Sequence, residues 1–117
     1  MNLVGFQLSN SGDFKSEKRI LKDCSDYIEQ KFRDNKRAEI LPGKIQEILN
    51  SLSRIKTIVE KNPNATDILN AIDNLESTCD AAMSLYPEPQ NRKFYFNHLK
   101  GLSPELKRVI RLLDRYK

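Results

Sequence analysis

The sequence predicts an all-α fold: a compact antiparallel bundle of four main helices plus a short aromatic helix, with an extended N-terminal arm. Three observations support this class. Apolar residues recur at steps of three and four along several long segments, which is the periodicity of an amphipathic helix and not of a strand. Glycine and proline are few and fall at the boundaries between these segments. A chain of 117 residues can bury a core as one domain without disulfides or metals.

We expect residues 1–13 to form a partly flexible N-terminal arm and residues 14–117 to form a single helical-bundle domain. Val4, Phe6 and Leu8 occupy alternating positions, so the arm could be a short strand, an extended segment or a disordered end. Chain termini are usually poorly ordered unless other contacts hold them, which favours disorder of at least part of this segment.

The first helix is expected to begin near Asp13 or Ser16, because either side chain can cap it, and to end near Asp34. The second helix lies within Leu41–Lys61 and is the segment around which we expect the bundle to form. Proline suits its first turn, because the missing N–H has no intrahelical partner there. Its apolar stripe is long and continuous and needs partner helices to bury it. The stripe residues are Ile45, Ile48, Leu49, Leu52, Ile55, Ile58 and Val59.

Asn64 is expected to cap the third helix, which runs to about Leu85 and ends before two prolines. The aromatic fourth helix covers Gln90–Lys100, and Gly101 is expected to end it as a C-cap residue. Ser103 followed by Pro104 is a strong start signal for a fifth helix. The predicted core comprises Ile20, Leu21, Cys24, Ile28, Ile45, Leu49, Leu52, Ile55, Val59, Ile72, Leu75, Cys79, Phe94, Val109 and Ile110.

Cys24 and Cys79 both fall in apolar stripes, so we interpret them as reduced, buried thiols and not as a disulfide. No window approaches the roughly 20 continuous apolar residues of a membrane span. The first residues lack the charged region and the apolar run of a secretory signal. We therefore expect a cytoplasmic protein that does not insert into a membrane.

The net charge of +4 conceals a segregation of charge along the chain. Residues 64–89 contain five acidic residues and no lysine or arginine, whereas residues 90–117 contain eight basic residues and two acidic ones. Such segregation concerns partners and solubility more than fold.

The basic face of the last helices is the best functional candidate. Lys107, Arg111 and Arg115 stand four residues apart, opposite an apolar stripe, and could contact phosphates or an acidic protein. A solvated or internally paired face is the plainer interpretation. The candidate partner-binding residues are Arg92, Lys93, Lys100, Lys107, Arg108, Arg111 and Arg115.

Asp73, Glu76 and Asp80 form an acidic face on the third helix, because their spacing of three and four residues aligns them on one side. Carboxylates suit a hard cation such as magnesium, but we favour a solvated face or one paired with a neighbouring helix. We predict no metal site and no cofactor, since the chain has no cysteine pair at ligand spacing and no glycine-rich phosphate loop.

Arg92 and His98 form an R-x5-H pattern that resembles the motif of the HEPN ribonucleases, which are also all-helical domains. The resemblance covers residues 90–99 only, and the position after the arginine, which in that family is usually polar and often asparagine, is Lys93 here. It implies that His98 would act as acid or base on an RNA phosphodiester and that Arg92 would stabilise the phosphate charge. The alternative is a surface arginine and a partly packed histidine, and we prefer it.

The sequence thus favours a non-enzymatic protein-interaction module, such as an adaptor, a regulatory inhibitor or a small subunit of a larger complex, without catalytic residues. One alternative is a nucleic-acid-binding accessory protein that uses the basic C-terminal helix, and a weaker one is a HEPN-like ribonuclease. The long stripe of the second helix could also serve self-association, so a two-fold homodimer is a further hypothesis.

Overall fold

The computed structural model describes residues 3–62, 64–86 and 88–115, with side chains described from residue 14 onward. Within that part of the chain the fold is an all-α bundle without strands, as predicted. Its four helices are α1 (Leu3–Arg33), α2 (Pro42–Val59), α3 (Thr66–Leu85) and α4 (Arg92–Leu113). Two short 3-10 turns, η1 (Arg37–Glu39) and η2 (Pro89–Asn91), follow α1 and α3.

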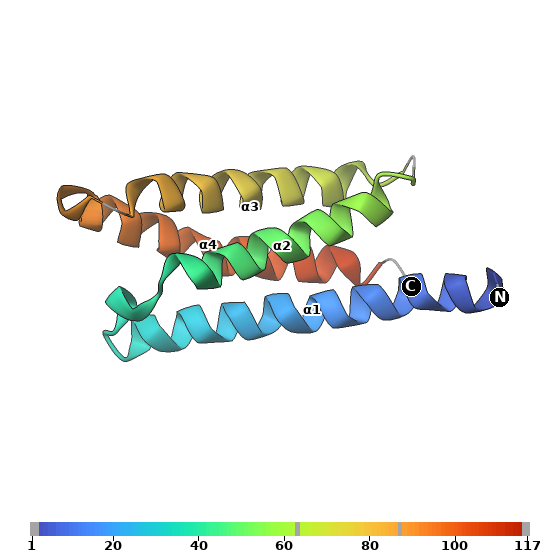
Figure 1. The fold of residues 1–117 in the computed structure, drawn as a ribbon, viewed down its shortest axis with the longest axis horizontal. Coiled ribbons are helices and arrows are strands. Elements are labelled where there is room, and N and C mark those ends of the chain that lie inside the picture. Colours follow the sequence, from blue (N-terminus) through green and yellow to red (C-terminus); the bar gives the residue numbers. More distant parts are fainter. Residues whose placement is uncertain (1–2, 63, 87, 116–117) are drawn as a thin grey trace.

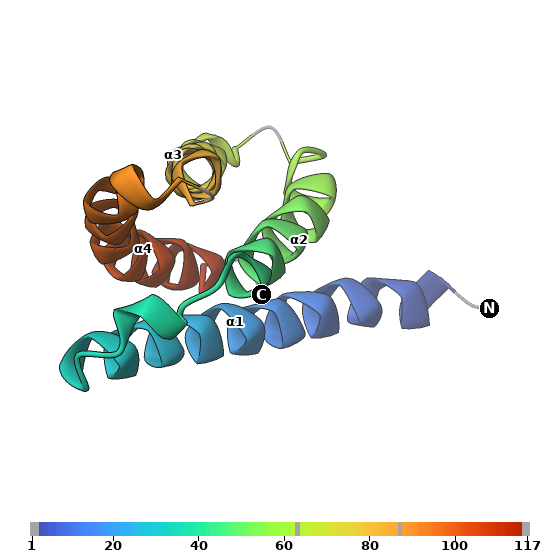
Figure 2. The same ribbon diagram turned by 60° about the vertical axis from the view of Figure 1, so that its left-hand side comes forward.

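The helices run alternately in opposite directions along the bundle (Figure 1). Each helix packs against the next in sequence, and α4 packs back against α1, so the bundle closes on itself. Figure 2 shows the helices at four corners, with α3 opposite α1 and α2 opposite α4. The short connections favour antiparallel packing of helices that are consecutive in the chain.

The expected N-terminal arm is helical, because α1 begins at Leu3 and not near Asp13 or Ser16. Its first turns extend beyond the ends of the other helices (Figure 1). The segment contains no proline, and a helix already nucleated by docked residues extends at one hydrogen bond per residue. The side chains of Val4, Phe6 and Leu8 lie outside the described residues, and flexibility of the arm stays a prediction.

The predicted break between a fourth and a fifth helix is absent, because α4 continues through Gly101 and Pro104. No glycine in the described residues has a positive φ, so Gly101 is not a left-handed C-cap. Proline inside a helix removes one hydrogen bond and costs about 3 kcal/mol. Burial of Leu99, Leu102 and Leu106 on both sides of this point offsets that cost, since one apolar face continues across it.

The predicted core is largely correct. Eleven of its side chains are buried, and Ile20, Leu49 and Ile110 pack against the core while remaining partly exposed. Phe94 is the error: it is 56% exposed, whereas Tyr95 is 3% exposed and donates a hydrogen bond to the Ile40 carbonyl at 2.7 Å. Three aromatic residues are consecutive here, and the orientation of the single long α4 turns the second of them, Tyr95, into the core in place of the first, Phe94.

The connection before α3 also differs from the prediction. The N-cap position of α3 is Ala65 and not the predicted Asn64, and Ala65 makes no side-chain cap hydrogen bond. Instead, the Asn62 side chain accepts a hydrogen bond from the Asn64 N–H at 2.9 Å, as in an Asx turn. Pro63 lies outside the described residues.

A buried carboxylate joins α1 to α2. Glu17 is 6% exposed and accepts hydrogen bonds from the Ser51 hydroxyl at 2.7 Å and from two Arg54 nitrogens at 2.7 and 3.0 Å. A buried charge without partners would be strongly destabilising, so this bidentate arrangement fixes how α1 sits on α2.

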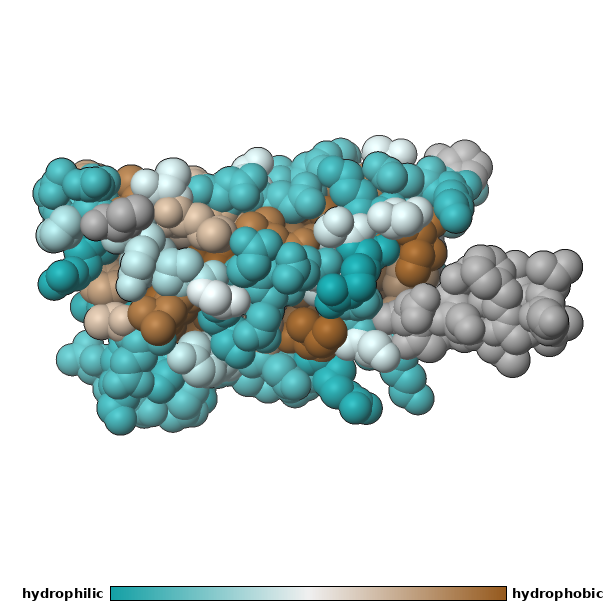
Figure 3. All heavy atoms as spheres, in the orientation of Figure 1, coloured by the Kyte–Doolittle hydropathy of each residue, from teal (hydrophilic) through white to brown (hydrophobic). Residues whose placement is uncertain are grey.

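Most of the apolar stripe of α2 is buried against the other helices of the same chain. Ile45, Ile48, Leu52 and Ile55 are fully buried, so they are not free to form the seam of a dimer. On the face in front of α2, hydrophilic side chains separate small apolar spots (Figure 3). None of the described helices combines the length and the apolar character that a membrane crossing requires.

Both cysteines are buried and free, as predicted. Burial raises the pKa of the Cys24 thiol to about 11 and that of Cys79 to about 12. These thiols therefore stay protonated near neutral pH and act as small apolar side chains.

We expect the Gly101→Ala substitution to stabilise the protein by about 0.5–1 kcal/mol, because alanine is the better helix former and its Cβ would meet no atom within 4 Å. Urea unfolding of both proteins measures the difference. A C-cap glycine would give the opposite sign, so a loss of stability would contradict the continuous α4.

Candidate functional site

The predicted basic residues lie mainly along the outer face of α4. Lys93, Lys100 and Lys107 are seven residues apart, and Arg111 follows four residues later. Seven residues make almost two turns of a helix, so these side chains align only because α4 is continuous. Arg92 lies at the start of the helix.

A groove of about 770 Å³ runs between α1 and α4 and includes three of the predicted residues. Its apolar base consists of the buried Ile28, the partly buried Phe32 and the exposed Pro104, so Phe32 and Pro104 provide the accessible apolar surface. Four cations surround this apolar base: Arg33 from α1 and Lys100, Lys107 and Arg111 from α4. We call this feature the α1/α4 groove.

One carboxylate lies inside the α1/α4 groove. Glu29 accepts a hydrogen bond from the Ser103 hydroxyl at 2.6 Å and forms an ion pair with Lys107. Two hydrogen bonds lower the pKa of Glu29 below its usual value: the one from Lys107 has the larger effect and the one from Ser103 the smaller. Glu29 is therefore ionised at neutral pH and neutralises one of the four cations.

Two serine hydroxyl groups link the Glu29 carboxylate to the interior of the bundle by hydrogen bonds. The buried Ser25 and Ser103 oxygens are 3.2 Å apart, and the Ser103 proton is donated to Glu29. Ser25 must then donate to Ser103, since each hydroxyl has one proton. The chain ties α1 to α4 at the base of the groove.

Most of the predicted cations have no acidic partner within the described residues. Only Lys107 forms an ion pair there, whereas Lys100, Arg111 and the remaining members of the basic face form none. Arg33 donates a hydrogen bond to the neutral Gln30 side chain at 2.6 Å. The face therefore presents uncompensated positive charge to an incoming anion.

The acidic face of α3 is turned toward α2. The Lys56 ammonium nitrogen lies 3.4 Å from a carboxylate oxygen of Asp73 and 3.4 Å from one of Glu76. The negative charge of Glu76, together with Asp73, raises the pKa of this lysine. Asp80 is exposed on the same helix. Among the residues that the structure describes, no group of three or more metal-ligating side chains is placed to hold a metal ion. The acidic face thus helps to join two helices and leaves the cations of α4 uncompensated.

Arg92 and His98 lie in different pockets. His98 faces a shallow pocket with Thr78 and Glu105, and its Nδ1 is 2.9 Å from the Phe94 carbonyl. Arg92 borders two pockets at the start of α4, neither of which includes His98. Within a single copy of the protein, Arg92 and His98 therefore do not share a pocket. The ribonuclease hypothesis stays a prediction.

The sequence analysis missed the contribution of α1. Of the α1 residues that line the groove, Ile28 was expected only as a core residue, and no role was predicted for Glu29, Phe32 or Arg33. The concentration of basic residues in the last turn of α1 was an available signal. Nothing in the sequence indicated that this turn lies beside α4.

The comparisons with known proteins give no relative for this architecture: no family model, no curated protein and no solved structure matches the chain.

Proposed function

We propose that this protein is a non-enzymatic interaction module that binds an acidic, amphipathic helical segment of a partner protein in the α1/α4 groove. The observation that supports the proposal is the combination of an apolar base, whose accessible surface comes from Phe32 and Pro104, with a rim of four cations. An amphipathic helix can place its apolar side in such a groove and its carboxylates against the rim.

The rim cations would orient the partner helix and speed its association more than they would increase the affinity. Exposed ion pairs contribute roughly 0–1 kcal/mol each, so most of the binding energy would come from the apolar base. Nucleic-acid phosphates could use the same cations, but a duplex would leave the apolar base unfilled. The free, buried thiols of Cys24 and Cys79 support a reducing compartment, and we propose the cytoplasm.

A labelled synthetic helix with leucines on one face and glutamates on the other should bind the protein saturably. Binding should weaken as salt increases, because the exposed charges are screened. Fluorescence anisotropy measures the affinity. A scrambled peptide of the same composition is the matched control, since it keeps the charge and loses the apolar face. Equal affinity for both peptides would contradict the proposed groove.

Two substitutions in the groove should shift this affinity in opposite directions. Lys100→Ala should weaken binding by about twofold to fivefold, because it removes one rim cation. Glu29→Gln should tighten binding by a similar factor, since it removes the carboxylate that competes for Lys107. Arg108→Ala removes the same charge from α4 outside the groove and is the control. An equal loss in Lys100→Ala and Arg108→Ala would indicate general charge attraction only.

A second candidate function is nucleic-acid binding along α4. It is favoured by Arg108, Arg111 and Arg115, which border one pocket near the end of α4 together with Asp67; Arg111 also belongs to the rim of the α1/α4 groove. A mobility-shift assay with single-stranded RNA and duplex DNA should then show binding that falls steeply with salt. The triple alanine variant should lose this binding and keep its fold. No shift at low salt would dismiss this candidate.

A further inference from the structure

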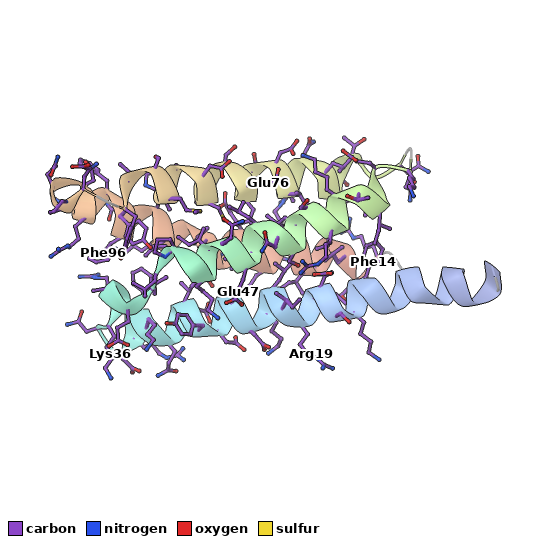
Figure 4. All side chains as sticks on the ribbon, in the orientation of Figure 1. Phe14, Arg19, Lys36, Glu47, Glu76 and Phe96 are labelled. Carbon is purple, nitrogen blue, oxygen red and sulfur yellow. The ribbon has the colours of Figure 1, made fainter. Side chains whose placement is uncertain are left out.

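Two pockets meet at the end of the bundle where η1, η2 and the start of α4 come together. They share Arg92 and Phe96. Phe96 lies at the same end as Lys36, which belongs to the connection after α1 (Figure 4). One pocket, of about 540 Å³, is cationic, and the other, of about 380 Å³, is aromatic. The two kinds of surface therefore adjoin around a shared wall.

The cationic pocket combines four positive side chains with one amide. Arg37 from η1 faces Arg92, Lys93 and Lys100 from α4, and Asn97 completes the lining. No carboxylate in the described residues forms an ion pair with any of the four cations. Cations gathered in this way repel one another, so a dianion that neutralises them binds favourably.

Arg37 makes cation–π contacts with two aromatic rings. Its guanidinium carbon lies 5.4 Å from the centre of the Phe96 ring and 6.0 Å from that of Phe32. A guanidinium stacked on aromatic rings loses less freedom when it binds an oxyanion, and its planar fork suits phosphate. Phe96 therefore positions a cation on one side and borders the aromatic pocket on the other.

Packed aromatic rings form one wall of the aromatic pocket. Tyr95 is fixed by its hydrogen bond to the Ile40 carbonyl and contacts Phe96, with ring centres 5.8 Å apart. Tyr86 packs its ring against Tyr95 at 5.2 Å and is 41% exposed, so one aromatic surface stays available. Glu88 adds the one carboxylate of this lining and can accept hydrogen bonds.

We propose that the joined pockets form a binding site for a nucleoside phosphate. The phosphate group binds Arg37, Lys93 and Arg92, and the flat base lies against the Tyr86 side of the aromatic pocket. Glu88 accepts a hydrogen bond from an amino group of the base, which a phosphorylated tyrosine could not supply. The same chemistry could come from a free nucleotide or from the 5′-phosphorylated end of a strand. This site does not depend on the α1/α4 groove, although Lys100 borders both.

The test is an NMR titration of the full chain with AMP, CMP, GMP and UMP. At least one nucleotide should bind saturably and shift the amide signals of Tyr86, Arg92 and Phe96. Adenosine lacks the phosphate and ribose 5-phosphate lacks the base, so each should bind at least about tenfold more weakly. A short oligonucleotide with a 5′-phosphate, compared with its 5′-hydroxyl form, identifies the source: tighter binding of the phosphorylated strand than of the nucleotide assigns the strand end.

Variants separate the two halves of the site. Tyr86→Ala should weaken nucleotide binding about fivefold or more through lost stacking, and leave inorganic phosphate binding unchanged. Arg92→Ala should weaken both, whereas Arg108→Ala, which lies outside these pockets, should weaken neither. The proposal is overturned if no nucleotide binds, if phenyl phosphate or inorganic phosphate binds as tightly as the nucleotides, or if Arg108→Ala causes the same loss as Arg92→Ala.

Discussion

The continuity of α4 through Gly101 and Pro104 is the constraint on which the rest of the structure depends. Two residues that usually end helices are kept inside one, because the apolar face on both sides of them belongs to the same core. A break there would rotate Lys93 and Lys100 relative to Lys107 and Arg111. It would also separate the aromatic end of the helix, with Tyr95 in the core, from Leu106 and the residues that follow.

Buried polar groups set the pairing of helices that the apolar residues alone would leave loose. Glu17 meets Ser51 and Arg54 between α1 and α2, and Ser25 meets Ser103 between α1 and α4. Leaving any of these groups unpaired in the interior would be unfavourable, so other registers of α1 are disfavoured. Both sets of contacts involve α1, so buried polar contacts join the longest helix to both of its neighbours, α2 and α4.

Charge in this protein is arranged by the tertiary structure. The acidic residues of α3 could in principle have neutralised the cations of α4, since the two helices are neighbours. Instead, Asp73 and Glu76 face Lys56 on α2, and Glu29 on α1 is the one described carboxylate paired with the basic face. Two cationic surfaces therefore remain, one with an apolar base and one beside aromatic rings.

The sequence by itself determined the all-α class, most of the buried apolar positions, the buried thiols and the basic residues of the last helix, because each depends on local periodicity or composition. It did not determine that α1 begins at Leu3, where we expected an arm. It could not decide whether Gly101 and Pro104 end a helix, since both signals are statistical and burial overrode them. It also placed Phe94 in the core in place of Tyr95, because adjacent aromatic residues leave the register open. Only the tertiary structure decided that α1 lies beside α4. The α1/α4 groove, the cation–π contact of Arg37 with Phe96, and the buried Glu17 all follow from contacts between residues far apart in the chain, which no local pattern encodes.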